Sequence, residues 1–152
     1  MPQAATANRS AERAAARALE LSNVVSNVPT ARHAVADDLR KVGVPKAVLE
    51  NVLLVVTELV SNAILHAKPI ELSDSGVGVI LRWTVSDRHV LIDVTDGGSA
   101  DTPRVKRPEY AEPEGRGLAI VDAVARNWAV RSAEDRVTVQ AVVGPWEPGM
   151  TS

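Results

Sequence analysis

Hydrophobic residues recur along this chain with two different periods, and each period indicates a different kind of element. From Pro45 to about Ala67 the apolar positions follow the 3.6-residue period of a helix. From Val77 to Ser86 they alternate with smaller or polar residues, which predicts a half-buried strand. A shorter helix is predicted from Asn27, which we expect to cap it, to about Val42, with Val35, Leu39 and Val42 inward. It is expected to end at Gly43, as helices often do.

The remaining elements follow from the same patterns. We expect strands over Leu19–Val25 and His89–Thr95, a turn at Asp87-Arg88, a loop over Ile70–Gly76, a helix from Gly115 to about Asn127, and a final hairpin of Trp128–Ala133 and Arg136–Val143 around Glu134-Asp135. The proline-containing stretch 99–114 has few apolar residues and is expected to be a functional or mobile loop.

This order of elements predicts an α+β fold. Parallel β-α-β alternation is missing, which argues against a doubly wound sheet and favours a mostly antiparallel sheet covered on one face by three helices. The Ala-rich stretch from Met1 to about Arg17 has no apolar face and is expected to be a flexible tail. We therefore predict one domain over residues 18–144 and a fraying tail over 145–152.

Composition narrows the classes of function. The 152 residues are enough for one domain with a real core, and the net charge of -2 gives no reason to expect nucleic acid. The absence of cysteine excludes disulfides and thiol chemistry and fits a cytoplasmic protein. We identify no apolar run near the ~20 residues of a membrane helix, and no signal peptide, so we expect no membrane partner.

Three polar residues form a stripe on the longest predicted helix. Glu58, Asn62 and His66 are spaced i, i+4 and i+8, in a run otherwise rich in Val, Leu and Ala. Taken alone, such a triplet is most simply the solvent-facing stripe of an amphipathic helix. Flanking apolar residues would nevertheless bury part of it, and buried polar groups need partners.

Two further segments change this interpretation. Asp93-Val94-Thr95-Asp96-Gly97-Gly98 ends a predicted strand, and strand parity points the Asp96 carboxylate inward with Val90, Ile92 and Val94. Glu114-Gly115-Arg116-Gly117-Leu118 places glycines at the start of an apolar helix, where unpaired N–H groups and the helix dipole favour anions.

In this order, the three segments resemble the motifs of the GHKL (Bergerat-fold) ATPases. Glu-Leu-Val-Ser-Asn-Ala-Ile-Leu-His-Ala resembles the asparagine box of that superfamily, Asp-Gly-Gly its first glycine box and Gly-Arg-Gly-Leu its second. The resemblance covers roughly Leu19 to Val143. It is closest to the stand-alone anti-sigma-factor serine kinases of bacteria and the similar single-domain regulators of actinobacteria.

The resemblance implies a site for ATP and Mg²⁺. Asp96 would accept a hydrogen bond from the adenine amino group, with Gly98 beside it. The backbone N–H groups of Gly115, Arg116, Gly117 and Leu118 would bind the phosphates, and the loop 99–114 would be the nucleotide lid.

On the long helix, the resemblance implies a metal ligand and a base. Asn62 would offer a hard oxygen to Mg²⁺. Glu58, one turn earlier, would orient or deprotonate the attacking hydroxyl during transfer of the γ-phosphoryl group. His66 would either lie behind the site and help to fix Asn62, or cap the end of the helix.

Two departures from the family pattern bear on nucleotide affinity. Ala100 stands where the first glycine box usually has a second glycine. Relatives also tend to carry a threonine pair on the last hairpin, whereas this chain has Val137-Thr138, and parity points Thr138 away from the interior. We therefore expect the affinity for nucleotide to be modest.

The function implied is that of an anti-sigma-factor regulator and protein serine kinase. Such a protein binds a sigma factor, phosphorylates a STAS-type anti-anti-sigma partner and often forms a homodimer. One alternative is a catalytically idle nucleotide-binding module that acts by partner binding only. Another is a detached histidine-kinase catalytic domain, which would lack the dimerisation helix pair and phospho-acceptor segment of that class.

Overall fold

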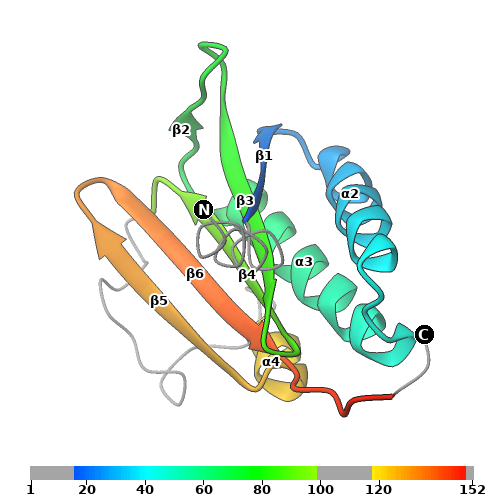
Figure 1. Ribbon diagram of the computed structural model, residues 1–152. Helices are drawn as coiled ribbons and strands as arrows, with labels where there is room; N and C mark the ends of the chain where they lie inside the picture. Colours follow the sequence, from blue (N-terminus) through cyan, green and yellow to red (C-terminus); the bar gives the residue numbers. More distant parts are fainter. Residues whose placement is uncertain (1–15, 99–117, 150–152) are drawn as a thin grey trace, which may run out of the picture.

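A mostly antiparallel sheet with helices on one face forms the part of the chain that the computed structural model describes, residues 16–98 and 118–149 (Figure 1). In these ranges there are six strands and three helices. The strands are β1 (Arg17–Ser22), β2 (Ile70–Glu71), β3 (Val77–Ser86), β4 (His89–Asp96), β5 (Asn127–Ala133) and β6 (Arg136–Val143). The helices are α2 (Asn27–Lys41), α3 (Lys46–His66) and α4 (Leu118–Val124). The predicted α+β class is confirmed.

The sheet order is β1-β3-β4-β6-β5, and each neighbouring pair is antiparallel. The short strand β2 pairs with the first two residues of β3, beyond the end of β4. The central strands β3, β4 and β6 therefore carry the sheet, and β1 and β5 form its edges.

The core lies between this sheet and the helices. Alternate residues of the central strands point toward the helices and are buried, as the period of two predicts. They include Val79, Leu81, Val90, Ile92, Val94 and Ala141, which pack against nine buried residues of α3. With no phenylalanine in the chain, Val, Leu, Ile and Ala fill this space.

The turn between β3 and β4 has the form that the sequence predicts. Ser86 pairs with His89, so the loop contains only Asp87 and Arg88. Both have positive φ angles, 53° and 60°. This two-residue geometry matches the right-handed twist of a hairpin, and it fixes the register that brings Asp96 to the helix-covered face.

The first strand and helix differ in detail from the prediction. The strand runs from Arg17 to Ser22, and its last residue, Ser22, pairs with Gly78. It ends there because the chain then turns toward α2. Asn27 does not cap α2; its Nδ2 donates to the carbonyl and hydroxyl oxygens of Ser22. Val42, predicted to point inward, is 58% exposed because α2 has already ended.

Two other boundaries were wrong. The segment predicted as a loop contains β2, whose Ile70 packs with Leu72 and Ile80 in a second, smaller apolar cluster. The helix α4 ends at Val124 rather than near Asn127, because Arg126 donates its N–H to Val142 and the chain joins the sheet. The predicted lid, residues 99–114, lies outside the described residues.

The segment after β6 was expected to fray, but its first residues are held in place. Trp146 donates its backbone N–H to the Arg88 carbonyl at 3.2 Å, and Arg88 Nε donates to the Trp146 carbonyl at 2.8 Å. The indole also packs partly buried against the core. The tail therefore buttresses the β3–β4 turn.

Helix α3 is long and apolar enough, by length and composition alone, to cross a membrane, which the sequence analysis did not anticipate. In this fold its apolar residues pack on the sheet and against α2. A core helix of this kind satisfies the same test as a membrane span, and the packing accounts for its composition.

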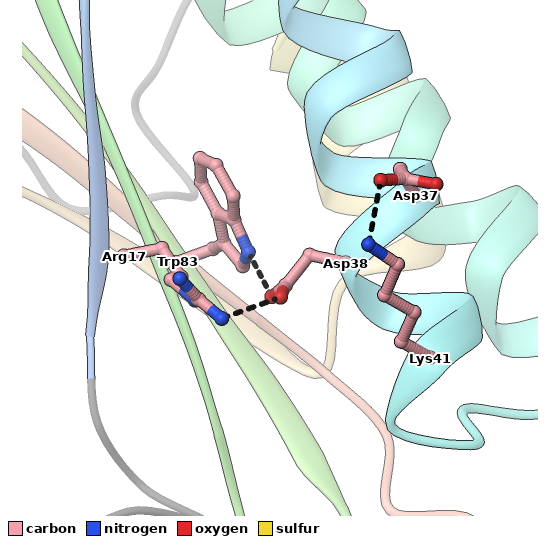
Figure 2. Close-up of polar contacts among 5 residues, drawn as sticks. All are labelled: Arg17, Asp37, Asp38, Lys41 and Trp83. Atoms are coloured by element: carbon pink, nitrogen blue, oxygen red, sulfur yellow. Dashed lines mark hydrogen bonds and ion pairs between the residues drawn. The ribbon is translucent and has the colours of Figure 1, made fainter.

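The edge strand β1 is joined to α2 through one carboxylate. Figure 2 shows Asp38 between Trp83 and Arg17, where it accepts a hydrogen bond from Trp83 Nε1 at 2.8 Å and pairs with Arg17 at 3.2 Å. The Trp83 side chain is nearly buried, so its indole N–H requires this partner. Asp37, by contrast, pairs with Lys41 in solvent.

Candidate functional site

The polar stripe on α3 is graded from half-buried to exposed. Glu58 and Asn62 are half-buried, whereas His66, the last residue of the helix, is exposed. The Asn62 Oδ1 atom is buried and accepts no hydrogen bond from any residue in the described ranges. A buried acceptor without a donor is costly unless a ligand satisfies it, so this atom is the strongest single indication of a binding site.

Asp96 ends β4 on the face of the sheet that the helices cover. Its side chain is buried, with 6% of the residue exposed, as strand parity predicts. Its Oδ1 accepts the backbone N–H of Gly98 at 2.6 Å. This local bond fixes the orientation of the carboxylate at the strand end.

The end of α3 and the end of β4 are clamped together by two backbone hydrogen bonds. Lys68 donates its N–H to the Gly98 carbonyl, and Gly97 donates its N–H to the Lys68 carbonyl, each at 2.7 Å. Glycine is required at position 97, because a Cβ there would lie 2.9 Å from the Lys68 carbonyl oxygen. Gly98 has a positive φ of 75°, a conformation that favours glycine. The glycines of the first box therefore allow this close approach.

Only Leu118 of the third predicted segment belongs to the described residues. Leu118 begins α4 and is buried, and Val121 joins the main core. Helix α3, which carries Glu58 and Asn62, packs against both β4 and α4, so the strand that ends at Asp96 and the helix that begins at Leu118 both lie beside it. Gly115, Arg116 and Gly117 lie outside the described residues, and their proposed role stays a prediction.

The last hairpin confirms the predicted orientation of Thr138. Its hydroxyl oxygen lies 2.8 Å from that of Thr95, on the sheet face away from the helices. Its neighbour Val137 stands opposite Asp96 in the pairing of β4 and β6. The side chain facing the Asp96 carboxylate across the sheet is thus apolar.

The perturbed carboxylate in the described ranges lies on the other face. Burial raises the pKa of Asp93, and the nearby guanidinium groups of Arg82 and Arg131 oppose the shift. The Arg82 to Asp93 distance is 4.0 Å, too long for a hydrogen bond. Asp93 therefore influences stability rather than the chemistry near Asp96.

A cavity of about 270 Å³ lies elsewhere, between the end of α2 and the start of α3. It is lined by Arg40, Val44, Lys46, Leu49, Glu50 and Leu53. Among the described residues, none of the predicted site residues borders it, and none of the residues that line it has a buried side-chain polar atom without a partner.

Chemically, the neighbouring segments offer three different groups. Asp96 provides an oriented acceptor, Asn62 an unpaired buried oxygen, and Glu58 a carboxylate one helical turn away. No cluster of three or more His, Asp or Glu side chains gathers in the described ranges. A single amide oxygen fits Mg²⁺, which keeps most of its waters and bridges phosphates.

The family comparison agrees with this arrangement. A family model described as a histidine kinase-like ATPase domain matches residues 21–143. Because the match covers most of the chain, the protein belongs to the histidine kinase-like ATPase domain family, and it is an ATP-binding domain of the GHKL type.

Among solved structures, the crystal structure of the RsbU and RsbW domains of Rv1364c from Mycobacterium tuberculosis is similar, with a TM-score of 0.66 and 17% identity. The match covers 90% of this chain and 34% of that one, so this chain spans about a third of the length of the chain it matches. At this identity the similarity establishes the fold. No curated protein matches the sequence significantly.

The sequence analysis missed two features of the site. The clamp at Lys68 is made by backbone atoms, and no side-chain pattern signals it. The inward direction of Val137 follows from the same parity that sends Thr138 outward, but its pairing with Asp96 depends on the register of β4 and β6, which the sequence analysis did not predict.

Proposed function

We propose that this domain is an ATP-dependent protein serine kinase of the anti-sigma-factor type. The observation that carries the proposal is the buried Asn62 Oδ1 without a donor in the described ranges, on the same helix face as Glu58. The oriented carboxylate of Asp96 at the neighbouring strand end supports a nucleotide as the missing ligand.

Each group then has a role in phosphoryl transfer. The Asp96 carboxylate accepts a hydrogen bond from the adenine amino group, which a guanine carbonyl would not provide. Asn62 holds a Mg²⁺ ion, which when bound neutralises charge on the phosphates. Backbone N–H groups of residues 115–118 bind the phosphates, as the resemblance to the family motif implies. Gly98 allows the end of β4 to approach the adenine base. His66 lies on the same face of α3 as Glu58 and Asn62.

Glu58 acts as the general base in this proposal. The serine hydroxyl oxygen forms a bond to the γ-phosphorus, the bond from that phosphorus to the bridging oxygen of ADP breaks, and the hydroxyl proton passes to Glu58. Removing the proton makes the attacking oxygen a better nucleophile as the transfer proceeds.

The proposed partners follow from the resemblance to anti-sigma-factor kinases. One state of the protein binds a sigma factor, and another binds and phosphorylates a STAS-type protein, with a homodimer as the assembly. A cytoplasmic location suits both partners. The fold shared with a structure containing an RsbW domain supports this branch of the family.

A second candidate is a nucleotide-binding interaction module without catalysis. One observation favours it: Thr138 bonds to Thr95 on the outer face, so its hydroxyl does not assist Asp96. In that case ATP would stabilise the fold and partner binding would carry the function.

Labelled ATP distinguishes the two candidates. The full chain is incubated with ATP labelled at the γ-phosphate and a STAS-domain protein, beside the variants Glu58→Gln and, as a matched exposed control on β2, Glu71→Gln. A kinase labels the partner, loses transfer in Glu58→Gln while still binding ATP, and retains it in Glu71→Gln. ATP binding without any transfer would contradict the kinase and favour the module.

A further inference from the structure

Helix α3 presents two large apolar side chains to solvent. Leu54 is 41% exposed and Leu65 is 62% exposed, although nine residues of the same helix are buried. Single exposed leucines are ordinary in folded proteins. This pair is distinguished by its position on either side of Glu58.

The two leucines and Glu58 lie on one stripe of the helix surface. Leu54, Glu58, Ser61 and Leu65 are separated by four, three and four residues, which places them on the same face. With a rise of 1.5 Å per residue, Leu54 lies about 6 Å before Glu58 and Leu65 about 10 Å after it along the axis.

The group between Glu58 and Leu65 is satisfied within the helix. The Ser61 hydroxyl donates to the Thr57 carbonyl at 2.6 Å, so it turns back toward its own backbone. The stripe therefore offers one carboxylate flanked by two apolar side chains. This is the arrangement that a hydroxyl-bearing segment with apolar neighbours would complement.

The charge around the stripe is uneven. Glu50 is exposed and lies one turn before Leu54, so carboxylates stand on both sides of that leucine, while Lys46 and Arg40 lie beyond Glu50 around the neighbouring cavity. A partner segment that rests on Leu54 would be favoured by a basic side chain nearby.

We propose that Leu54 and Leu65 form a docking stripe for the serine-bearing segment of a partner protein. Apolar side chains on both sides of the serine rest on the two leucines, a basic side chain pairs with Glu50, and the hydroxyl reaches Glu58. This inference rests on the proposed kinase function. The leucines are specificity-determining residues and take no part in the chemistry.

A second copy of this chain fits the stripe less well as an occupant. A self-complementary contact across Leu54 and Leu65 would cover Glu58 and close the approach of the hydroxyl. The partner segment must instead place its own hydroxyl at that point, so a substrate is the occupant that the geometry favours.

The test uses synthetic peptides with one serine and the full protein chain. The first peptide has Leu on both sides of the serine and a Lys at the end that would lie near Leu54. The second peptide has Ala in place of both Leu residues. The third has Glu in place of the Lys. Wild type should transfer labelled phosphate to the leucine peptide roughly tenfold faster per apolar flank, since burying a leucine is worth at least that factor. It should prefer Lys over Glu.

Variants assign the preference to the stripe. Leu54→Ser should remove the preference for Leu on one side of the serine and Leu65→Ser on the other, with nucleotide affinity unchanged in both. Val42→Ser, at a valine just after α2 whose exposure lies between those of the two leucines, serves as the control and should keep both preferences. If the double leucine variant keeps the wild-type preference, the docking stripe is wrong.

A binding measurement separates this inference from the kinase proposal. Fluorescence anisotropy with the leucine peptide carrying Ser→Ala reports docking without transfer. Binding that the double variant loses, with no label transferred by wild type, supports the stripe and refutes the kinase. Transfer without any apolar preference supports the kinase and refutes the stripe, and neither binding nor transfer refutes both.

Discussion

Thr95 and Thr138 place their hydroxyl oxygens 2.8 Å apart on the sheet face away from the helices. Because adjacent residues of a strand point in opposite directions, Asp96 and Val137 face each other on the helix side. The residue opposite the proposed adenine acceptor is therefore apolar, and the nearest threonine hydroxyl bonds elsewhere.

Val137→Thr should tighten the binding of Mg-ATP. The new hydroxyl would stand opposite Asp96, where it can bond to the carboxylate or the base edge, and a net hydrogen bond of about 1 kcal/mol corresponds to roughly fivefold in affinity. Isothermal titration measures the change. Thr138→Val is the matched control and should leave the affinity unaltered. If Thr138→Val changes the affinity more than Val137→Thr does, the adenine lies on the sheet face away from the helices, which contradicts the proposed site.

Asp96→Asn should weaken ATP binding while preserving the local fold. The asparagine oxygen can still accept the Gly98 N–H, but the charged acceptor for the adenine amino group is lost. Hydrogen bonds to charged groups contribute about 1.5–3 kcal/mol, so the affinity should fall roughly 10- to 100-fold. Titration with ATP, beside a thermal melt without nucleotide, measures both properties, and an unchanged affinity would contradict the assignment.

Asn62→Ala should uncouple nucleotide binding from magnesium. If Asn62 Oδ1 is a ligand of Mg²⁺, as proposed, removal of Mg²⁺ with EDTA should weaken ATP binding by the wild-type protein. In the variant, affinities measured with and without Mg²⁺ should converge. If Mg²⁺ strengthens ATP binding equally in both proteins, the ion is not held by Asn62.

Asp93→Asn should stabilise the protein at neutral pH. The raised pKa of Asp93, caused first by burial, means that the folded chain binds this proton more tightly than the unfolded chain does. The contribution of Asp93 to the free energy of unfolding therefore falls as the pH rises from the ordinary pKa of the unfolded chain to the raised pKa of the folded chain. The loss persists at all higher pH values.

The gain from Asp93→Asn, below about 1 kcal/mol because the carboxylate is partly screened by water, should vanish as the pH is lowered through that interval. Urea unfolding at several pH values measures it, with Asp135→Asn in the exposed β5–β6 turn as the control. Lower stability of Asp93→Asn at pH 7 would mean that Arg82 and Arg131 outweigh the burial.

Asp38→Ala should destabilise the fold, whereas the same substitution at the neighbouring Asp37 should not. Removing Asp38 leaves the nearly buried Trp83 N–H without its acceptor, at a cost of about 1–3 kcal/mol. Asp37→Ala removes only a solvent-exposed pair with Lys41 and should change stability by less than about 0.5 kcal/mol. Urea midpoints compare the two, and equal losses would show that the Trp83 bond is unimportant.

Periodic segments of the fold were predictable from the sequence. The bounds of β3 were predicted correctly, because ten alternating residues and a two-residue turn constrain them strongly. The short strand β2 was missed, since two residues carry no period. The anchoring of Trp146 was missed as well, because it depends on a carbonyl of Arg88, more than fifty residues away in sequence.

The candidate site was predictable where side-chain direction follows from parity. The inward carboxylate of Asp96 and the outward Thr138 are both confirmed. The buried Asn62 oxygen required knowledge of what surrounds the helix, which no local pattern contains. The roles of Glu58 and His66 in binding and catalysis remain predictions.

The pair of backbone hydrogen bonds between Lys68 and the glycines after β4 makes the spacing of the site a property of the main chain. Substitution of side chains around it can alter what is recognised, but not the separation of the strand that offers Asp96 from the helix that offers Asn62. The separation of the two elements is therefore set before any ligand binds, and a nucleotide that used both would not have to order them.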